Sequence, residues 1–290
     1  MENRKPVIIT GTSSGIGLTT AVHLACKGFK VYATMRDVNR RHALEEEARR
    51  HNVSVDVLPC DITSQDDITA VIEHVIASSG RMYGLVNNAG INIRGFFEDL
   101  SDREMRAVLE TNLFGTMAVT RSALPYLRSH RDSRIVIMSS SGGRIASPAS
   151  SAYCTSKFAL EGFGESLAQE MIPFGVHVSL VEPGLVATDL FWRNRKAAQQ
   201  SGQPEGVYSP WFHRLERFTD AEVQTVKTPA THVAEAVWRA LTAKRPRLRY
   251  VVGSRAKLLL CLRKRLPCAV FDSIWAALVN RAMGGRSPVV

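Results

Sequence analysis

The chain has 290 residues, a net charge of +10 and 45% hydrophobic residues. Such a length suits one large domain, or two small ones, with a sizeable buried core. No uninterrupted apolar stretch reaches about 18 residues, which argues against a simple membrane-spanning helix, and no leader-like segment precedes the first apolar run, so we expect a cytoplasmic protein. The five cysteines contain no C-x-x-C pair, which favours a reduced compartment and argues against a disulfide framework or a zinc site.

The positive charge is concentrated in one segment. Residues 236–271 contain ten Lys or Arg and no Asp or Glu. Their charge of +10 equals the net charge of the whole chain. The remainder of the chain is balanced, as expected of a metabolic enzyme that carries a basic tail. Because no recognised reading module accompanies the charge, we do not expect nucleic-acid binding.

Short β-rich runs alternate with helix-length segments over the first 185 residues. This alternation predicts a parallel sheet with crossover helices on both faces. We expect strands at 6–10, 30–34, 53–58, 84–88, 134–139, 176–182 and 248–252. We expect helices at 15–28, 39–51, 64–79, 101–129, 152–173 and 229–243. The chain is therefore predicted to form a single doubly wound, Rossmann-type α/β domain with seven parallel strands over residues 1–253, followed by a basic extension over 254–290.

A glycine-rich segment follows the first apolar run and opens into a helix. Its pattern is G-x-x-x-G-x-G. Glycines let the backbone turn tightly and approach a pyrophosphate, while the positive end of the helix faces the anion. A ligand-free glycine turn is the alternative. The residues expected to contact a nucleotide phosphate are Gly11, Thr12, Ser13, Ser14, Gly15, Ile16 and Gly17.

Tyr153 and Lys157 are spaced i and i+4, which places them on one face of the predicted helix. A carbonyl reduced by hydride needs an acid for the developing alkoxide, and the reverse reaction needs the same group as a base. A neighbouring ammonium can stabilise a tyrosinate and lower the phenol pKa. An exposed helix surface is the alternative interpretation. The chain has no H-E-x-x-H and no G-x-S-x-G, which argues against a metalloprotease and an α/β-hydrolase, and we expect no metal.

Taken together, the glycine segment, the strand ends and the Tyr and Lys pair resemble the classical short-chain dehydrogenase/reductase family over residues 7–188. The strand ends that carry the resemblance are Asp61-Ile62, Asn88-Ala89-Gly90, Ser139-Ser140-Ser141 and Glu182-Pro183-Gly184. The resemblance implies a catalytic tetrad of Asn112, Ser140, Tyr153 and Lys157. Ser140 would orient the substrate oxygen, since it lies 13 residues before Tyr153, and Asn112 would hold a water in a proton relay toward the lysine.

The same resemblance implies further contacts with a dinucleotide. Asp61 and Ile62 would contact adenine, and residues 88–90 would line the adenosine side. The nicotinamide carboxamide would be held by Pro183, Gly184, Val186 and Thr188, with Tyr153 and Lys157 also in contact with the cofactor. At the end of the second strand Arg36 suits a 2′-phosphate, so we expect NADP(H). A solvated arginine partnered with Asp37 is the alternative.

Three longer stretches, 33–37, 153–170 and 173–183, resemble the branch of type 1 17β-hydroxysteroid and photoreceptor retinol dehydrogenases. The branch implies a steroid-like or retinoid-like alcohol or carbonyl as substrate, while a 3-oxoacyl or other aliphatic ketone stays open. A non-catalytic NADP(H) sensor or scaffold is the competing class. The family also implies a homodimer, formed through the helices at 101–129 and 152–173.

Residues 190–228 correspond to the family's substrate lid and are rich in aromatic side chains. These side chains either line an apolar pocket or pack the lid onto the body of the protein. The lid aromatics are Phe191, Trp192, Tyr208, Trp211, Phe212 and Phe218. The expected substrate residues are Ser140, Phe191, Trp192 and His213.

The extension places apolar residues 258–262 among basic ones and continues into an apolar helix candidate over 268–283. This combination suits peripheral contact with an anionic membrane surface. The alternative is that the apolar residues cover the substrate cleft or a subunit interface while the basic ones stay solvated.

Overall fold

Seven parallel strands form one sheet in the computed structural model, which describes residues 4–186, 195–225 and 228–284. Their order is β3-β2-β1-β4-β6-β7-β9 and every neighbouring pair is parallel. The strands are β1 (Pro6–Thr10), β2 (Lys30–Met35), β3 (Asp56–Pro59), β4 (Gly84–Asn87), β6 (Arg134–Met138), β7 (His177–Pro183) and β9 (Arg249–Val252). The predicted doubly wound sheet is therefore confirmed.

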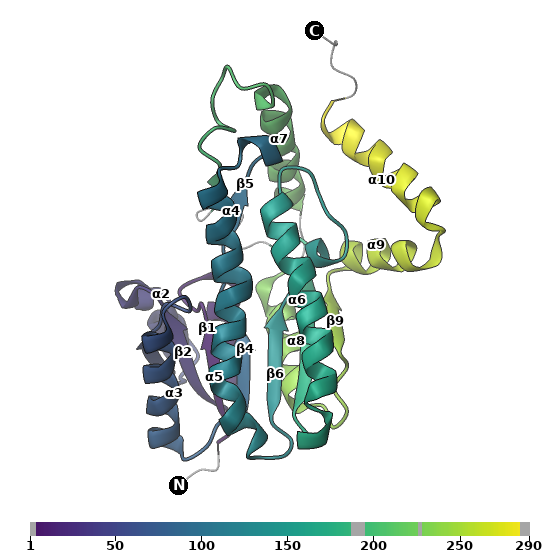
Figure 1. Ribbon diagram of the computed structural model, residues 1–290. Helices are drawn as coiled ribbons and strands as arrows, with labels where there is room; N and C mark the ends of the chain where they lie inside the picture. Colours follow the sequence, from purple (N-terminus) through teal and green to yellow (C-terminus); the bar gives the residue numbers. More distant parts are fainter. Residues whose placement is uncertain (1–3, 187–194, 226–227, 285–290) are drawn as a thin grey trace.

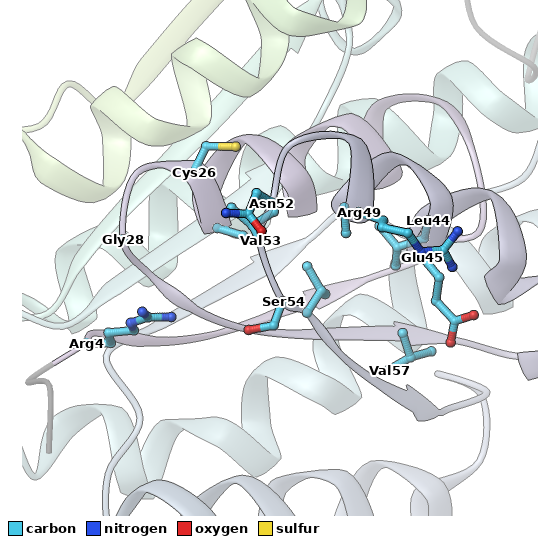
Figure 2. A pocket seen from close by; sticks show the side chains of 13 residues that line it. Arg4, Cys26, Gly28, Leu44, Glu45, Arg49, Asn52, Val53, Ser54 and Val57 are labelled. Atoms are coloured by element: carbon cyan, nitrogen blue, oxygen red, sulfur yellow. The ribbon is translucent and has the colours of Figure 1, made fainter.

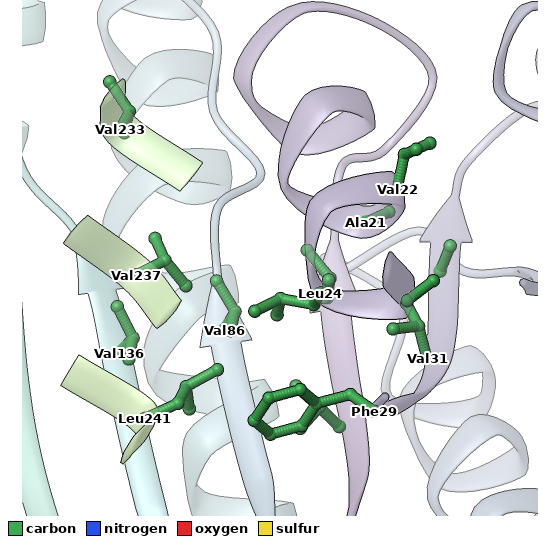
Figure 3. Close-up of a cluster of buried hydrophobic side chains, with 14 of the residues drawn as sticks. Ala21, Val22, Leu24, Phe29, Val31, Val86, Val136, Val233, Val237 and Leu241 are labelled. Carbon is green, nitrogen blue, oxygen red and sulfur yellow. The ribbon is translucent and has the colours of Figure 1, made fainter. Parts of the chain in front are cut away.

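Helices cover both faces of this sheet (Figure 1). They are α1 (Gly15–Cys26), α2 (His42–Arg50), α3 (Gln65–Ser79), α4 (Asp102–Leu109), α5 (Thr116–Arg128), α6 (Ser151–Glu170) and α8 (Ala230–Thr242). One core joins α1 and α8 to the sheet, and Figure 3 shows Leu24 and Val237 in it, on either side of Val86. A second core lies under α3, α5 and α6. Because both sheet faces are buried, the strands are nearly continuous apolar runs.

The predicted helix at 101–129 is not one regular helix. A π-helical segment, Glu110–Gly115, separates α4 from α5. A Cβ added to Gly115 would lie 2.9 Å from the Ile62 side chain, so this turn is pressed closely against the end of the third strand. Asn112 lies within the π-helical segment and is fully buried. Such single-turn interruptions are frequent at functional sites.

The predicted lid region contains α7 (Ser209–Thr225) and a two-residue strand, β8 (Lys196–Ala197). β8 pairs in parallel with β5 (Ile93–Arg94) in a small second sheet that the sequence patterns do not predict. The extension forms α9 (Ser254–Arg265) and α10 (Cys268–Ala282), which lie outside the β9 edge of the sheet in Figure 1. Across the described residues, no helix is both long and apolar enough to cross a membrane.

Candidate active site

The glycine segment turns from β1 into α1 with no space for side chains. Gly11 has a φ of +70°, and a Cβ there would lie 2.6 Å from the Ala89 Cα. A Cβ on Gly17 would lie 2.2 Å from the Gly11 carbonyl oxygen. These contacts explain both glycines by close packing of the turn and by the left-handed conformation at Gly11.

The N-terminus of α1 fits a phosphate group. Its N-cap, Ser14, makes no side-chain capping hydrogen bond, and no acidic residue lies in the first turn. Residues 13–16 keep part of their surface exposed. Since the first N–H groups of a helix lack intrahelical partners and carry partial positive charge, this end favours an anion. The residues present therefore fit the diphosphate of a dinucleotide.

Thr10 holds the glycine-rich loop against the turn after β4, a role that the sequence patterns do not predict. Its Oγ accepts hydrogen bonds from the backbone N–H groups of Asn88 and Ala89, both at 3.0 Å. The Asn88 amide donates to the carbonyl oxygens of Thr10 and Gly11, both at 2.9 Å. The Asn88 side chain is thus used to bind the two strand ends together, and its contact with adenosine stays a prediction.

The side chains of both residues predicted to contact adenine are engaged within the protein. The Asp61 carboxylate accepts from the Thr63 N–H at 3.0 Å and from the Thr63 hydroxyl at 2.7 Å. Ile62 is 5% exposed and its side chain packs in the core under α3 and α5. Any contact of Ile62 with a ligand would therefore involve its backbone.

Arg36 is exposed at the end of β2, whereas Met35 before it is buried. The alternative pairing with Asp37 is not observed, because that carboxylate accepts from the Asn39 N–H at 3.0 Å. Within the described parts of the chain, Arg36 has no hydrogen-bond or ion-pair partner. Its guanidinium is available to an anionic ligand.

Tyr153 and Lys157 lie in the first two turns of α6. The Lys157 Nζ donates to the Met138 carbonyl oxygen at 2.8 Å and lies 5.6 Å from the centre of the Tyr153 ring. A Cβ on Gly90 would lie 3.8 Å from this Nζ and 3.2 Å from the Asn112 Oδ1. The amine, the phenol ring and the turn after β4 therefore meet at the carboxyl end of the sheet.

Desolvation dominates the acid–base properties of this pair. Burial lowers the pKa of Lys157 to about 8, although the charge of Glu161 opposes the change. Burial raises the pKa of Tyr153 to about 12, although a hydrogen bond with Ser140 acts in the opposite direction. The expected lowering of the phenol pKa is thus wrong, because removing the phenolate from water outweighs the stabilising contacts.

Ser140 is the serine that faces Tyr153. Its Oγ accepts from the Gly142 N–H at 3.0 Å. A Cβ on Gly142 would lie 3.4 Å from this Oγ and 3.5 Å from the Tyr153 Cε1, so both side chains border the same point. Ser139 is buried instead, and its hydroxyl has no hydrogen-bond partner in the described structure.

The Asn112 side chain connects the turn at Ile91 to α6 through hydrogen bonds. Its Oδ1 accepts from the Ile91 N–H at 2.8 Å, and its Nδ2 donates to the Ile91 carbonyl oxygen at 2.9 Å and to the Ser156 hydroxyl at 3.0 Å. Ser156 in turn donates to the Tyr153 carbonyl oxygen at 2.7 Å. Ser156, which the sequence patterns do not distinguish, thereby links the π-helical segment to the helix that carries Tyr153.

A charge cluster centred on a buried glutamate lies beside the predicted nicotinamide site. Glu182, directly before Pro183, is fully buried and contacts Arg144 at 3.2 Å and Arg249 at 3.3 Å. Arg249 also binds Glu161 of α6 at 2.8 Å. Burial raises the pKa of Glu182 to about 7, reinforced by the charge of Glu161 and opposed by the two arginines. The cluster joins α6 to β7 and β9.

The lid helix α7 is fastened by a buried ion pair that sequence patterns do not reveal. Arg94, 7% exposed, contacts Glu216 at 2.6 Å. Arg195 contacts the same carboxylate at 2.8 Å. The Tyr208 ring stacks on Phe96 with 4.8 Å between ring centres. For Tyr208, packing the lid onto the body is therefore the observed role.

The candidate substrate residues have different environments. His213 is exposed on α7, whereas its neighbour Phe212 is buried against Ala149 and Leu215. Val186, which is predicted to contact the nicotinamide carboxamide and not the substrate, is buried after β7. Three predicted contacts lie outside the described residues: Thr188, Phe191 and Trp192.

A hollow of about 930 Å³ lies elsewhere, at the amino ends of the first strands (Figure 2). Its walls include Arg4 before β1, Gly28 before β2 and Ser54 before β3. In sheets of this kind ligands bind beyond the carboxyl ends of the strands. The hollow is therefore separate from the candidate active site.

Residues 5–199 match the family described as short chain dehydrogenase. The chain belongs to this family. It is an oxidoreductase whose family binds nicotinamide cofactors. The resemblance to a branch with steroid and retinol dehydrogenases is confirmed by the relatives that follow.

Human 17-beta-hydroxysteroid dehydrogenase type 1 is 36% identical over 98% of this chain and 88% of its own. Bovine retinol dehydrogenase 8 is 32% identical over 95% of this chain and 93% of its own. Mouse mitochondrial D-beta-hydroxybutyrate dehydrogenase is 35% identical over 85% of this chain and 76% of its own. The crystal structure of a short-chain dehydrogenase from Streptomyces avermitilis has a TM-score of 0.75 at 30% identity, covering 97% of this chain and 96% of that one.

Proposed function

We propose that the protein is an NADP(H)-dependent oxidoreductase that interconverts a lipophilic secondary or allylic alcohol, steroid-like or retinoid-like, with its carbonyl compound. The proposal rests mainly on the meeting of Ser140, Tyr153 and Lys157 at the carboxyl end of the sheet. The complete tetrad argues against a non-catalytic sensor or scaffold, which has no evident need for all four groups. When bound, a nicotinamide dinucleotide supplies or accepts the hydride.

In the proposed reaction, the Ser140 hydroxyl donates a hydrogen bond to the substrate oxygen and Tyr153 transfers the proton. A phenol whose pKa is about 12 is protonated at neutral pH and can donate its proton to the substrate oxygen. Lys157, with a pKa of about 8, is mostly charged at neutral pH and stabilises negative charge on the phenol oxygen. Asn112 keeps the Ile91 turn and the catalytic helix in place. Where NADP(H) is kept mostly in its reduced form, we propose carbonyl reduction as the favoured direction.

Replacement of Tyr153 by Phe tests this mechanism. We expect turnover to fall by about 100-fold to 10,000-fold, as is typical of a lost general acid, while NADPH affinity stays within about threefold of the wild-type value. Tyr250→Phe, which removes a hydroxyl that accepts from the Arg247 N–H at the amino end of β9, is the matched control. Retained turnover in Tyr153→Phe would exclude the proposed proton transfer.

Arg36 supports NADP(H), because its exposed guanidinium can bind a 2′-phosphate by charge-assisted hydrogen bonds. In Arg36→Asp, NADPH binding should weaken by at least about tenfold more than NADH binding. Arg49→Asp, an exposed arginine of α2, controls for the general loss of charge. Equal losses for both cofactors would contradict the assignment.

The proposed substrate class is supported by the printed activities of the steroid and retinol relatives and by the exposed apolar surface of the extension. A screen of steroids, retinoids, aliphatic ketones and 3-oxoacyl thioesters, followed by NADPH absorbance, separates the candidates. Highest kcat/KM on a short aliphatic ketone would overturn the lipophilic assignment.

We further propose a homodimer formed by the faces of α5 and α6. Three aromatic side chains are exposed on or beside these faces, with exposed fractions of 51%, 36% and 45%: Phe114 in the π-helical segment before α5, Tyr126 of α5 and Phe158 of α6. Aromatic residues of this kind are enriched at protein interfaces. Light scattering of the purified protein gives the mass that tests this.

A further inference from the structure

The two helices of the extension expose rows of large apolar side chains. On α9, Leu258 and Leu262 are 63% and 40% exposed. On α10, Val270, Ile274 and Leu278 are 45%, 48% and 51% exposed. Each row has i, i+4 spacing and therefore forms one stripe along its helix. We call these five side chains the tail stripe.

Basic side chains accompany the tail stripe. Residues 254–284 contain six Lys or Arg and a single acidic residue, Asp272. Arg255 forms an ion pair with Glu222, and Arg263 forms one with Asp272. The remaining four are exposed and, within the described parts of the chain, have no ion-pair partner: Lys257, Lys264, Arg265 and Arg281. The surface thus combines apolar side chains with uncompensated positive charge.

Contacts with the body hold the two helices next to the candidate active site. A Cβ on Gly184 would lie 2.8 Å from the Cβ of Ala256, so α9 begins against the predicted nicotinamide site. The Trp275 Nε1 of α10 donates to the Ala146 carbonyl oxygen at 3.0 Å, in the loop between Ser140 and α6. In Figure 1, α9 leaves the sheet beside β9 and α10 runs back toward α7. The tail stripe is therefore placed close to the site.

We propose that α9 and α10 dock on the surface of an anionic lipid bilayer, with the tail stripe inserted between the headgroups and the basic side chains beside the lipid phosphates. Apolar area and attraction between Lys or Arg and anionic headgroups are the two terms that drive such binding. A second copy of the same surface is a poorer partner, since it would bring the positive side chains of both copies together.

Docking would let the protein take its substrate directly from the bilayer, and this part of the inference rests on the proposed function. A steroid-like or retinoid-like molecule dissolves mainly in the bilayer. Docking through the extension brings the end of the sheet that carries Ser140 and Tyr153 to that surface. It requires no membrane-spanning helix.

Sedimentation of the full-length protein with vesicles tests the proposal. We expect binding to vesicles of phosphatidylglycerol mixed with phosphatidylcholine, and at least about tenfold weaker binding to phosphatidylcholine alone. The double variants Leu258→Ser/Leu262→Ser and Ile274→Ser/Leu278→Ser should each weaken anionic binding by at least about tenfold. Ile172→Ser should leave anionic binding unchanged, because this residue is equally apolar and 70% exposed but lies just beyond the C-terminal end of α6.

Charge variants provide the second arm. Lys264→Gln/Arg265→Gln should weaken vesicle binding several-fold and reduce its dependence on salt. The matched control Arg49→Gln/Arg103→Gln removes two exposed arginines from other surfaces and should have no such effect. Thermal unfolding and NADPH binding verify that each variant is folded.

Four outcomes would overturn the docking proposal: no binding to anionic vesicles, equal binding to both vesicle types, unchanged binding by the tail variants, or a change of oligomeric mass in those variants in place of a change in vesicle binding. Binding of duplex DNA without vesicle binding would identify a different partner. Turnover of a water-soluble ketone is measured in the same samples. Its loss would count against the proposed function, whereas its retention with absent vesicle binding would count against the docking alone.

Discussion

Lys157 offers the sharpest test of how the site is built. Its side chain is 4% exposed, and its Nζ donates to the Met138 carbonyl oxygen at 2.8 Å. Burial lowers the pKa of the amine from 10.5 to about 8. The unfolded chain therefore binds this proton more tightly, and the free energy of unfolding should rise as the pH increases from about 8 toward 10.5. Lys157→Met removes this dependence along with the amine.

The size of the effect follows from the difference between the two pKa values. Keeping the Lys157 amine charged in its buried position lowers the free energy of unfolding by about 3 kcal/mol at neutral pH. About 2 kcal/mol of this penalty disappears by about pH 9.5. Removing the amine also leaves the Met138 carbonyl oxygen without its donor, which costs about 1 to 3 kcal/mol and is nearly the same at every pH. Between about pH 7 and about pH 9.5, the wild type should therefore gain about 2 kcal/mol relative to Lys157→Met.

Urea unfolding at both pH values measures this difference by linear extrapolation. Lys244→Met, an exposed lysine after α8, is the control and should show no comparable change with pH. Turnover by Lys157→Met should be lost at both pH values. If the stability difference between Lys157→Met and wild type stays constant with pH, or moves in the opposite direction, the amine does not experience the desolvation described.

Two further variants examine the glycine-rich loop and the charge cluster around Glu182. Gly17→Ala places a Cβ 2.2 Å from the Gly11 carbonyl oxygen and 2.5 Å from the Asn88 Nδ2, so dinucleotide binding measured by fluorescence should fall by more than about tenfold. Gly162→Ala, which meets nothing within 4 Å on α6, should instead be neutral or slightly stabilising. For Glu182, the pKa raised from 4.5 to about 7 means that the free energy of unfolding falls as the pH rises from about 4.5 to about 7. The melting temperature of Glu182→Gln relative to wild type should therefore increase from about pH 5.5 to about pH 8, and parallel pH curves would contradict this.

The sheet was predictable because its local and global signals agree. The five inner strands are mainly apolar and almost fully buried, and parallel strands buried on both faces require such runs. The prediction of the third strand is the least accurate, since β3 begins at Asp56, three residues after the predicted start. Its pairing with β2 begins only at Tyr32 and Asp56, while residues 53–55 line the hollow at the sheet edge. Tertiary pairing, which composition does not encode, determines that boundary.

The contacts that position the site were less predictable. Arg94 and Glu216 are 122 residues apart in sequence, and nothing in either neighbourhood indicates the ion pair. The π-helical turn around Asn112 leaves the apolar periodicity almost unchanged, so one continuous helix was the natural prediction. By contrast, the Ser140 to Tyr153 spacing selected the serine that lies beside the tyrosine.

The helix α6, which carries Tyr153 and Lys157, is joined to the extension by two short paths. Glu161, one turn after Lys157, binds Arg249 of β9 at 2.8 Å, and β9 leads directly into α9. Ala256 of α9 packs against Gly184, next to the predicted nicotinamide site. The tail stripe contributes to neither path, because its side chains point outward and are exposed. Serine substitutions in the stripe should therefore weaken vesicle binding while leaving turnover of a water-soluble substrate unchanged, which would separate access to the substrate from the chemistry itself.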